Sequence, residues 1–501
     1  MSVPNGKVQA TDSVVAEPAL TFSNIINGEA RRGEKTTRAI NPSNKQPLWE
    51  IPVANENDVN DAVNAAAAAF PAWSQTPWEE RAKYLERARE VLLGLRDTLS
   101  SLIMQENGKP IQFAKMEVDH SAGSLAYNAS HPPLQPRVAQ DDDELRITVR
   151  HVPIGVVAAI CPFNYPLVQA VAKIGPALIT GNTVIVKPSP FTPYSTLKFV
   201  EAVKDIFPPG VLQVLNGDAQ TGALLCEHPN VQHISFTGSI AVGKKIMATA
   251  SKSLKRVTLE LGGNDACVVC PDIDVSVVAP QVAVGAFLNS GQFCLACKRI
   301  YVHEDIYEEF KQKLVDVVKS WKTSPSTPDA GNTLGPLQNE MQFAKGKSYF
   351  EDSRKNGYRF ALGGDDAYYD DSSYVLQPAI IDNPPDDSRI VREEPFAPIV
   401  PLLKWSSEDD LIARVNDTNT GLGASVWSGD VDRAVALGQR IHAGNVTINH
   451  FPVPHPNAHL AGWKESGLSG EYGTEGLQAY CNVQTMQCFK APVGAGSAEA
   501  E

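Results

Sequence analysis

The pattern of apolar and polar residues changes character along the chain. In residues 22–54, short apolar runs alternate with Asn-Gly and Asn-Pro turn signals, which indicates paired strands. Residues 57–97 place apolar side chains three and four positions apart among strong helix formers, which predicts helices. From residue 150 to 270, short β-branched runs alternate with helical stretches, and a second alternating region follows from 275 to 450. Such alternation predicts parallel sheets in an α/β fold.

One strand-to-helix turn is a candidate phosphate site. In "FTGSIAVG", an expected strand runs into Gly238 and Ser239, and a helix containing Gly243 follows. Glycines at such a turn let a diphosphate approach the backbone near the positive end of the helix dipole. A plain strand-to-helix turn is an equal alternative from this motif alone, because the chain contains no G-x-G-x-x-G fingerprint.

Composition narrows the class of protein. The 501 residues are 43% hydrophobic, and the net charge of −13 argues against a surface for nucleic acid. No apolar run reaches membrane-spanning length, and the N-terminus lacks the basic and apolar regions of a secretory signal. With eight cysteines and no such signal, we expect reduced thiols and a cytoplasmic location. Residues 1–20 and 492–501 are expected to be disordered tails.

Four cysteines form two C-x2-C pairs separated by 23 residues, namely Cys267 with Cys270 and Cys294 with Cys297. A zinc site would need all four thiolates to converge, and the usual gap is about 15–20 residues. Moreover, residues three apart on the expected strand "ACVVC" point to opposite faces. A thioredoxin-like redox pair does not fit the surrounding pattern. Buried core cysteines and a single nucleophile are the remaining interpretations.

The nucleophile interpretation draws on two segments. In "NSGQFCLACKR", three small or polar residues before Phe293 allow close backbone approach at Cys294. In "LELGGNDA", Glu260 stands between leucines, and a buried carboxylate with a raised pKa is the usual design of a general base. A solvated glutamate at a sheet edge is a fair alternative when this segment is considered alone.

Together, these segments resemble the aldehyde dehydrogenase superfamily. The resemblance covers residues 22–490 and rests on motifs in the family's order, which are "CPFNYPL", "GPALITGNTVIVKPSPFTP", "FTGSIAVG", "LELGGNDA", "GQFCLACKR", "EEPFAPI" and "GWKESGLSGEYG". The separation of 34 residues between Glu260 and Cys294 (294 − 260) also agrees with the family. This ordered set removes the zinc interpretation, and no metal is expected.

The resemblance implies two doubly wound parallel-sheet domains and a small β oligomerisation arm. A Rossmann-like coenzyme domain would comprise residues 21–134 and 156–262, and a catalytic domain residues 263–465. The arm would comprise residues 135–155 and 480–491. The alternating stretch "ELRITVRHV" is expected to be an edge strand covered by a partner, so the resemblance implies a homodimer or homotetramer.

The resemblance also implies roles for individual residues. Cys294 would be the nucleophile, Glu260 the general base and Asn164 the side chain that stabilises the oxyanion, with Lys173 and Glu471 relaying protons. The implied coenzyme residues are Gly238 and Ser239 at the diphosphate, Lys187 at the adenosine ribose, Glu394 at the nicotinamide ribose, Phe396 beside the nicotinamide, and Phe163 and Leu261. The implied substrate residues are Val168, Gln169, Ala172, Phe293 and Leu295, together with the loop "NHFPVPHPN".

The implied function is oxidation of an aldehyde to a carboxylic acid with NAD through a cysteine thiohemiacetal and thioester. Glu260 favours the hydrolytic branch over the CoA-acylating one, which lacks a base there. Pro190 stands where many NAD-using members have a glutamate, so NADP is a possible second coenzyme. The implied pocket has no basic residue to clamp a substrate carboxylate, which favours a medium-sized aliphatic or aromatic aldehyde. A non-catalytic relative with a structural or binding role is the alternative, and Cys267, Cys270 and Cys297 are interpreted as core or pocket-wall residues.

Overall fold

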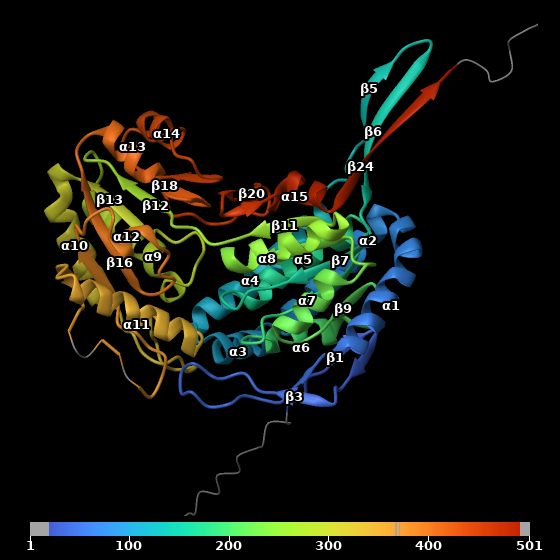
Figure 1. Cartoon of the computed structure of the whole chain (residues 1–501), viewed down its shortest axis with the longest axis horizontal. Helices are drawn as coiled ribbons and strands as arrows, with labels where there is room; N and C mark the ends of the chain where they lie inside the picture. The colour runs from blue at the N-terminus through green and yellow to red at the C-terminus, as the bar shows by residue number, and fades with distance from the viewer. Residues whose placement is uncertain (1–19, 366–367, 370, 491–501) are drawn as a thin grey trace, which may run out of the picture.

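Two sheet-centred lobes and a projecting arm make up the molecule (Figure 1). The computed structural model describes residues 20–365, 368–369 and 371–490, so all but residue 20 of the two predicted tails lie outside the described residues. The mixed α/β architecture with mostly parallel sheets confirms the expected fold class. Among the described residues, no helix combines the length and apolar character needed to cross a bilayer.

The first lobe is built on an eight-stranded sheet in the order β2-β1-β9-β8-β7-β10-β11-β22. The five strands from β9 to β11 are parallel, and the strands beyond them pair antiparallel. The predicted strand pairing near the N-terminus is confirmed, because β1 and β2 form a hairpin at Asn27 and Gly28, which both have positive φ. The strands are β1 (Asn24–Ile26), β2 (Glu29–Arg31), β7 (Val156–Ile160), β8 (Thr183–Lys187), β9 (Leu212–Val214), β10 (His233–Thr237), β11 (Arg256–Glu260) and β22 (Gly467–Leu468).

Helices pack against this sheet, and their breaks follow local sequence. The helices predicted over residues 57–97 are present, and a break after Gly94 separates α2 from α3, because glycine is a poor interior helix residue. An Asn55–Asp58 capping box starts the first helix. The helices are α1 (Glu56–Gln75), α2 (Trp78–Gly94), α3 (Arg96–Asn107), α4 (Ile111–Ser130), α5 (Pro166–Ile179), α6 (Tyr194–Val203), α7 (Ala219–Glu227), α8 (Ile240–Ala250) and α15 (Gly473–Ala479).

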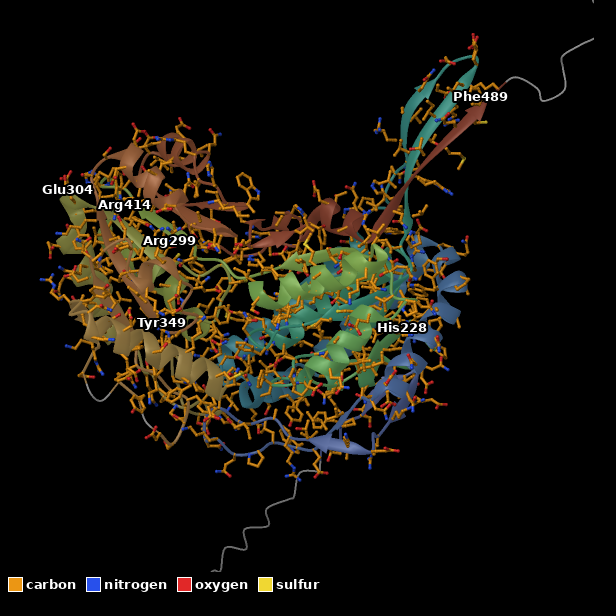
Figure 2. The ribbon with its side chains drawn as sticks, in the orientation of Figure 1. His228, Arg299, Glu304, Tyr349, Arg414 and Phe489 are labelled. Carbon is orange, nitrogen blue, oxygen red and sulfur yellow. The ribbon has the colours of Figure 1, made fainter. Side chains whose placement is uncertain are left out.

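The second lobe has a seven-stranded sheet in the order β14-β15-β16-β13-β12-β18-β19, parallel except for β14. Arg299, Tyr349 and Arg414 lie in this lobe (Figure 2). Its strands are β12 (Ala266–Val269), β13 (Arg299–His303), β14 (Phe360–Leu362), β15 (Ala379–Asp382), β16 (Ile399–Trp405), β18 (Gly423–Trp427) and β19 (Asn445–Ile448). Its helices are α9 (Val275–Phe287), α10 (Tyr307–Lys319), α11 (Glu340–Lys355), α12 (Arg389–Arg392), α13 (Glu408–Asn416) and α14 (Val431–Gly438).

Short elements connect these layers. Antiparallel pairs form between β3 (Lys35–Thr37) and β4 (Ile51–Val53), between β17 (Thr420–Gly421) and β21 (Trp463–Lys464), and between β20 (Leu460–Ala461) and β23 (Gly470–Glu471). Single 3₁₀ turns are η1 (Ser251–Ser253), η2 (Leu288–Gly291) and η3 (Glu304–Ile306).

The arm is a three-stranded antiparallel sheet of β5 (Arg137–Asp141), β6 (Leu145–Pro153) and β24 (Cys481–Phe489). The expectation that the 144–152 stretch is an edge strand is wrong, because β6 lies between β24 and β5 and pairs with β24 along its whole length. Local alternation does not show a partner strand from the far end of the chain, although the resemblance assigned residues 480–491 to the same arm. The long free edge therefore belongs to β24, whose terminal Phe489 is 69% exposed at the tip of the arm (Figure 2). The division of the chain into coenzyme, catalytic and oligomerisation units stays a prediction.

A short linker joins the two large sheets. Strand β11 ends at Glu260 and β12 begins at Ala266, so residues 261–265 join the carboxyl edge of the first sheet to the amino edge of the second. A linker this short keeps the two edges close together. Ligands of open α/β sheets bind beyond the carboxyl ends of the strands, so this junction is a candidate ligand-binding site.

Candidate active site

The parallel register aligns several predicted site residues along the carboxyl edge of the first sheet. Thr237 at the end of β10 pairs with Glu260 at the end of β11, and Ile160 at the end of β7 pairs with Lys187 at the end of β8. The predicted base and the predicted ribose-binding lysine thus lie on one edge of one sheet.

The loop that carries Cys294 has an unusual backbone. Asn289, Ser290 and Gly291 all have positive φ, and a Cβ at Gly291 would lie 2.3 Å from the carbonyl oxygen of Ala397. Such conformations are costly for non-glycine residues and persist where the surrounding structure imposes them. They turn the chain sharply after α9, so that Cys294 remains partly accessible while its neighbours are buried.

Asn164 is fixed against this loop. Its amide nitrogen Nδ2 donates to the carbonyl oxygen of Gln292 at 3.0 Å, two residues before Cys294. Its own carbonyl oxygen accepts hydrogen bonds from the side chains of Asn107, Lys109 and Asn289. The predicted oxyanion donor and the predicted nucleophile therefore belong to one hydrogen-bonded unit.

A buried ion pair holds the backbone of Asn164 through the hydrogen bond that Lys109 donates to it. Lys109 and Glu117 are both inaccessible to solvent and contact each other directly. Oxygen Oε1 of Glu117 also accepts the N–H groups of Leu167 and Val168 in the first turn of α5, which follows Asn164. Breaking such a buried pair costs about 3–5 kcal/mol, so this region is held rigidly.

Glu260 is a buried carboxylate without a fixed partner. It is 5% exposed, and its oxygen Oε1 has no hydrogen-bond partner among the described residues. Burial, with a further contribution from Glu471, holds the pKa of Glu260 well above its usual value, and Lys173 opposes this rise. The structure confirms that this glutamate is buried, and an unpaired carboxylate with a raised pKa suits proton abstraction.

The predicted relay pair is assembled behind Glu260. The Lys173 ammonium lies 2.5 Å from Oε1 of Glu471 and donates to Oγ1 of Thr237 at 2.8 Å. Both charged groups are buried. Thr237 is the strand partner of Glu260, so the pair lies next to the candidate base.

Charges around the Cys294 sulfur act in opposite directions. Burial raises the pKa of the Cys294 thiol to about 12, and the ammonium of Lys298 lowers it. Asp265, Glu260 and Glu394 add to the rise. Apolar and aromatic neighbours surround the thiol, which packs with a cluster of Phe293, Leu295, Ala296, Leu422, Leu460, Tyr165, Leu288 and Tyr472.

The residues predicted for the coenzyme diphosphate form a close turn. The N–H of Gly238 donates to the carbonyl oxygen of Glu260, and a Cβ at Gly238 would lie 2.4 Å from the ring of Phe236. Ser239 caps α8, and its hydroxyl accepts from Val242. Because Gly238 has no side chain, a diphosphate could approach the backbone there, near the positive end of the α8 dipole.

The residues predicted for the two riboses have different partners. Burial lowers the pKa of Lys187 to about 8, and its ammonium donates to the carbonyl oxygen of Pro188 at 3.2 Å, which leaves donors for a sugar hydroxyl. Glu394 forms an ion pair with Lys298 at 3.1 Å. Leu261, also predicted for the coenzyme, packs against Gly243, where a Cβ atom would collide with the leucine side chain.

Two predicted aromatic residues pack beside Glu394. The rings of Phe163 and Phe396 meet edge to face with centroids 6.0 Å apart, and Phe396 has a positive φ of 54°. A bulky residue in that conformation is strained, and such strain persists only where the surrounding structure imposes it.

The predicted substrate residues have differing environments. Phe293 packs edge to face on Tyr165, with ring centroids 5.6 Å apart. Leu295 is 1% exposed and packs against the start of β18, where a Cβ at Gly423 would collide with it. On α5, Ala172 is buried, Val168 is half-buried, and the amide oxygen of Gln169 accepts from Lys173 at 3.4 Å. In the predicted loop, His450 is exposed and hydrogen-bonds the carbonyl oxygen of Phe451.

Several residues around the thiol were not predicted from the sequence. Lys298, Asp265, Tyr165 and Tyr472 all interact electrostatically with Cys294. Tyr165 and Tyr472 directly follow the predicted site residues Asn164 and Glu471, and Lys298 belongs to the same motif as Cys294. A charged or phenolic side chain within a motif was therefore the available signal. The environment of Asp265 depends on the junction of the two sheets, which no local pattern shows.

The other three cysteines of the two C-x2-C pairs lie in the core. Cys267 and Cys270 belong to clusters on opposite faces of the second sheet, so their sulfurs do not point to a common centre. The Cys297 thiol hydrogen-bonds Cys267 and lies 3.7 Å from the hydroxyl of Ser425. The prediction that these three cysteines are core or pocket-wall residues agrees with their burial.

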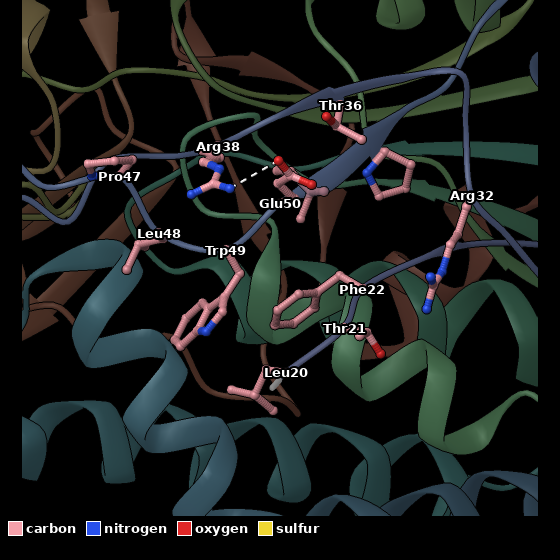
Figure 3. Close-up of a pocket in the computed structure, with 12 residues that line it drawn as sticks. Leu20, Thr21, Phe22, Arg32, Thr36, Arg38, Pro47, Leu48, Trp49 and Glu50 are labelled. Carbon is pink, nitrogen blue, oxygen red and sulfur yellow. Dashed lines mark hydrogen bonds and ion pairs between the residues drawn. The ribbon is translucent and has the colours of Figure 1, made fainter. Parts of the chain in front are cut away.

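A separate pocket of about 570 Å³ lies under the N-terminal strands (Figure 3). Phe22 and Trp49 form its aromatic wall, and Arg38 pairs with Glu50 at its rim. None of the predicted site residues lines this pocket, so it is distinct from the candidate active site.

Comparisons with known proteins agree with this arrangement. The profile of the aldehyde dehydrogenase family matches residues 29–486. The FUS7 protein of Gibberella moniliformis is 42% identical over 471 residues, and the alignment covers 94% of this chain and 99% of that protein. Aldehyde dehydrogenase LUC3 of Fusarium sp is 39% identical over 470 residues, with the same coverage of both chains.

A solved structure extends the similarity to three dimensions. The NAD+ complex of an aldehyde dehydrogenase from Bacillus cereus is similar with a TM-score of 0.91 and 31% sequence identity, covering 93% of this chain and 96% of that chain. Profile, relatives and structure all span nearly the whole protein. The chain therefore belongs to the aldehyde dehydrogenase family and is an oxidoreductase that acts on aldehydes.

Proposed function

We propose that this protein oxidises an aldehyde to the free carboxylic acid through a covalent intermediate on Cys294. The observation that carries the proposal is the presence in one region of a partly exposed cysteine, an amide donor fixed to the same loop and a buried carboxylate whose Oε1 has no hydrogen-bond partner among the described residues. A nucleophile, an oxyanion donor and a base are the three groups that acyl chemistry needs.

Attack by the Cys294 thiolate on the aldehyde carbon creates an alkoxide. The amide of Asn164, together with the backbone N–H of Cys294, would donate to this oxygen. In sites of this type, one such donor contributes about 3–4 kcal/mol to transition-state stabilisation. The bonds from Asn107, Lys109 and Asn289 hold Asn164 ready before substrate arrives.

The turn at Gly238 and Ser239, the spare donors of Lys187 and the carboxylate of Glu394 fit NAD as the coenzyme. Bound NAD would supply the acceptor for the hydride that leaves the thiohemiacetal, which thereby becomes a thioester. Glu260 would then deprotonate water for attack on the thioester and release the acid. Lys173 and Glu471 would carry the proton away, and their direct contact next to Glu260 supports this role.

Coenzyme choice gives a first prediction. Pro190 follows the ribose lysine by three positions, and it leaves no carboxylate to repel a 2′-phosphate. We expect a higher kcat/KM with NAD than with NADP, but measurable use of both. Pro190→Glu should lower kcat/KM for NADP more than for NAD, because the new charge repels only the phosphate. Initial rates with both coenzymes test this, and a strict NADP preference of the natural protein would refute it.

The substrate pocket favours a medium-sized aliphatic or aromatic aldehyde. Its support is the aromatic and aliphatic cluster of Phe293, Tyr165 and Leu460 around the thiol. A panel of aldehydes read by absorbance of the reduced coenzyme would rank the candidates.

We also propose a cytoplasmic location, supported by eight cysteines that are all free thiols.

Self-association through the arm gives a second prediction. The free edge of β24 exposes Val483 and Phe489, which lie on one face of the strand because they are an even number of positions apart. An exposed edge of this length is expected to pair with a second copy, giving a dimer or tetramer. The double substitution Val483→Asp and Phe489→Asp should lower the molar mass measured by light scattering. An unchanged mass, or a monomeric natural protein, would exclude the arm as the interface.

A further inference from the structure

Lys298, to which the family resemblance gave no role, lies close to the candidate nucleophile. Lys298 follows Cys294 by four positions, just before β13, and its side chain is 4% exposed. Its ammonium donates to the carbonyl oxygen of Cys294 and lies 3.1 Å from Oε1 of Glu394. Its backbone N–H donates to the carbonyl oxygen of Asp265 in the linker between the two sheets. One residue therefore ties the nucleophile loop to the linker and to the predicted coenzyme carboxylate.

We propose that Lys298 is a positioning residue that holds the Cys294 loop against Glu394 and keeps a positive charge beside the nucleophilic thiol. The inference rests on the proposed role of Cys294. A buried ammonium is costly unless it is paired, and here Glu394 forms an ion pair with it and Asp265 interacts with it electrostatically. A second lysine, Lys345, donates to the backbone oxygen of Glu394 at 2.8 Å, so Glu394 is held from two sides.

The electrostatics agree with this geometry. Burial lowers the pKa of Lys298, but Glu394, Asp265 and Cys294 outweigh it and leave the pKa above its ordinary value. The lysine therefore stays charged at neutral pH. The groups that face the thiol are Lys298 on its own loop, Asp265 and Glu260 at the linker, Glu394, and the phenols of Tyr165 and Tyr472. Lys298 is the one cation in this set, so it alone favours the thiolate.

The test measures the thiol without turnover. The rate of iodoacetamide labelling of the peptide that contains Cys294 is followed against pH in the full-length protein without coenzyme or aldehyde. We expect Lys298→Met to move the midpoint upward by about one pH unit, because a neighbouring opposite charge shifts a pKa by about 1–3 units. Lys298→Arg should restore the natural midpoint. Lys298→Gln provides the same neutral substitution if the methionine variant does not fold.

A matched control separates this charge from general charge loss. Lys345→Met also removes an ammonium next to Glu394, although a partly buried one, and leaves the contact to Cys294 intact. Its midpoint should move less than that of Lys298→Met. A midpoint of Lys298→Met equal to that of the natural protein, or an equal shift in Lys345→Met, would overturn the inference. Because labelling needs no catalysis, either result is distinguishable from a failure of the proposed aldehyde oxidation.

Discussion

Replacing Cys294 with alanine is expected to abolish aldehyde oxidation, with kcat/KM falling by at least about 10⁴-fold. Removing a nucleophile leaves only the weak contribution of binding and of the oxyanion donors, and losses of this size are typical of such substitutions. Alanine keeps the loop geometry, because the contacts that hold the loop are made by the backbone of Cys294 and by Asn164, Gln292 and Lys298. Initial rates at saturating coenzyme, with folding checked by circular dichroism, give the result.

Cys297→Ala is the matched control for this variant. It removes the other thiol of the same C-x2-C pair, which lies in the core against Cys267 and Ser425 rather than beside the amide of Asn164. We expect most activity to remain, with a modest decrease in melting temperature from the lost packing. Equal loss of activity in the two variants would remove the reason to single out Cys294.

Glu260→Gln is expected to separate the two halves of the reaction. The amide cannot accept a proton from water, so steady-state turnover should fall by about 10²–10⁴-fold, the usual contribution of a general base. The first turnover should still occur, and stopped-flow absorbance should show a burst of reduced coenzyme close to the enzyme concentration. The substitution is nearly isosteric, and the site lacks a fixed hydrogen-bond partner for Oε1, so the fold should tolerate it.

The outcome of this variant bears on the branch of the family. Full steady-state activity would show that another group activates water. Loss of the burst together with turnover would show that Glu260 is needed before the thioester forms, in which case it also accepts the thiol proton.

The raised pKa of Glu260 adds a pH dependence of known sign. Because the base acts when deprotonated, thioester hydrolysis should rise with pH through that elevated pKa.

Local patterns predicted those parts of the fold that local interactions determine. The alternation of strand and helix indicated two parallel sheets, and the Asn-Gly signal at residues 27 and 28 indicated the first hairpin. The edge-strand interpretation of β6 was wrong because its second partner, β24, comes from the opposite end of the chain. Helix α2 ended earlier than its apolar spacing suggested, because Gly94 interrupts it.

In the candidate site, too, some residues could be named from the sequence, whereas the contacts that hold them could not. Motif residues such as Asn164, Glu260 and Cys294 could be named from the sequence, and the structure adds how they are held. The hydrogen bond from Lys109 to the carbonyl oxygen of Asn164 and the ion pair between Lys298 and Glu394 join segments that are remote in sequence. Their significance depends on burial, which makes a paired charge obligatory and is visible only in three dimensions.

The most direct test of the proposed mechanism is to identify the atom that carries the acyl group. The Glu260→Gln variant is mixed with NAD and an aldehyde that the natural protein oxidises, quenched in acid, digested and mapped by mass spectrometry. The account predicts that the peptide containing Cys294 gains the mass of the acyl group and that fragmentation places it on Cys294 rather than on Cys297. An acyl group on another residue, or reduced coenzyme formed without any acylated peptide, would contradict it.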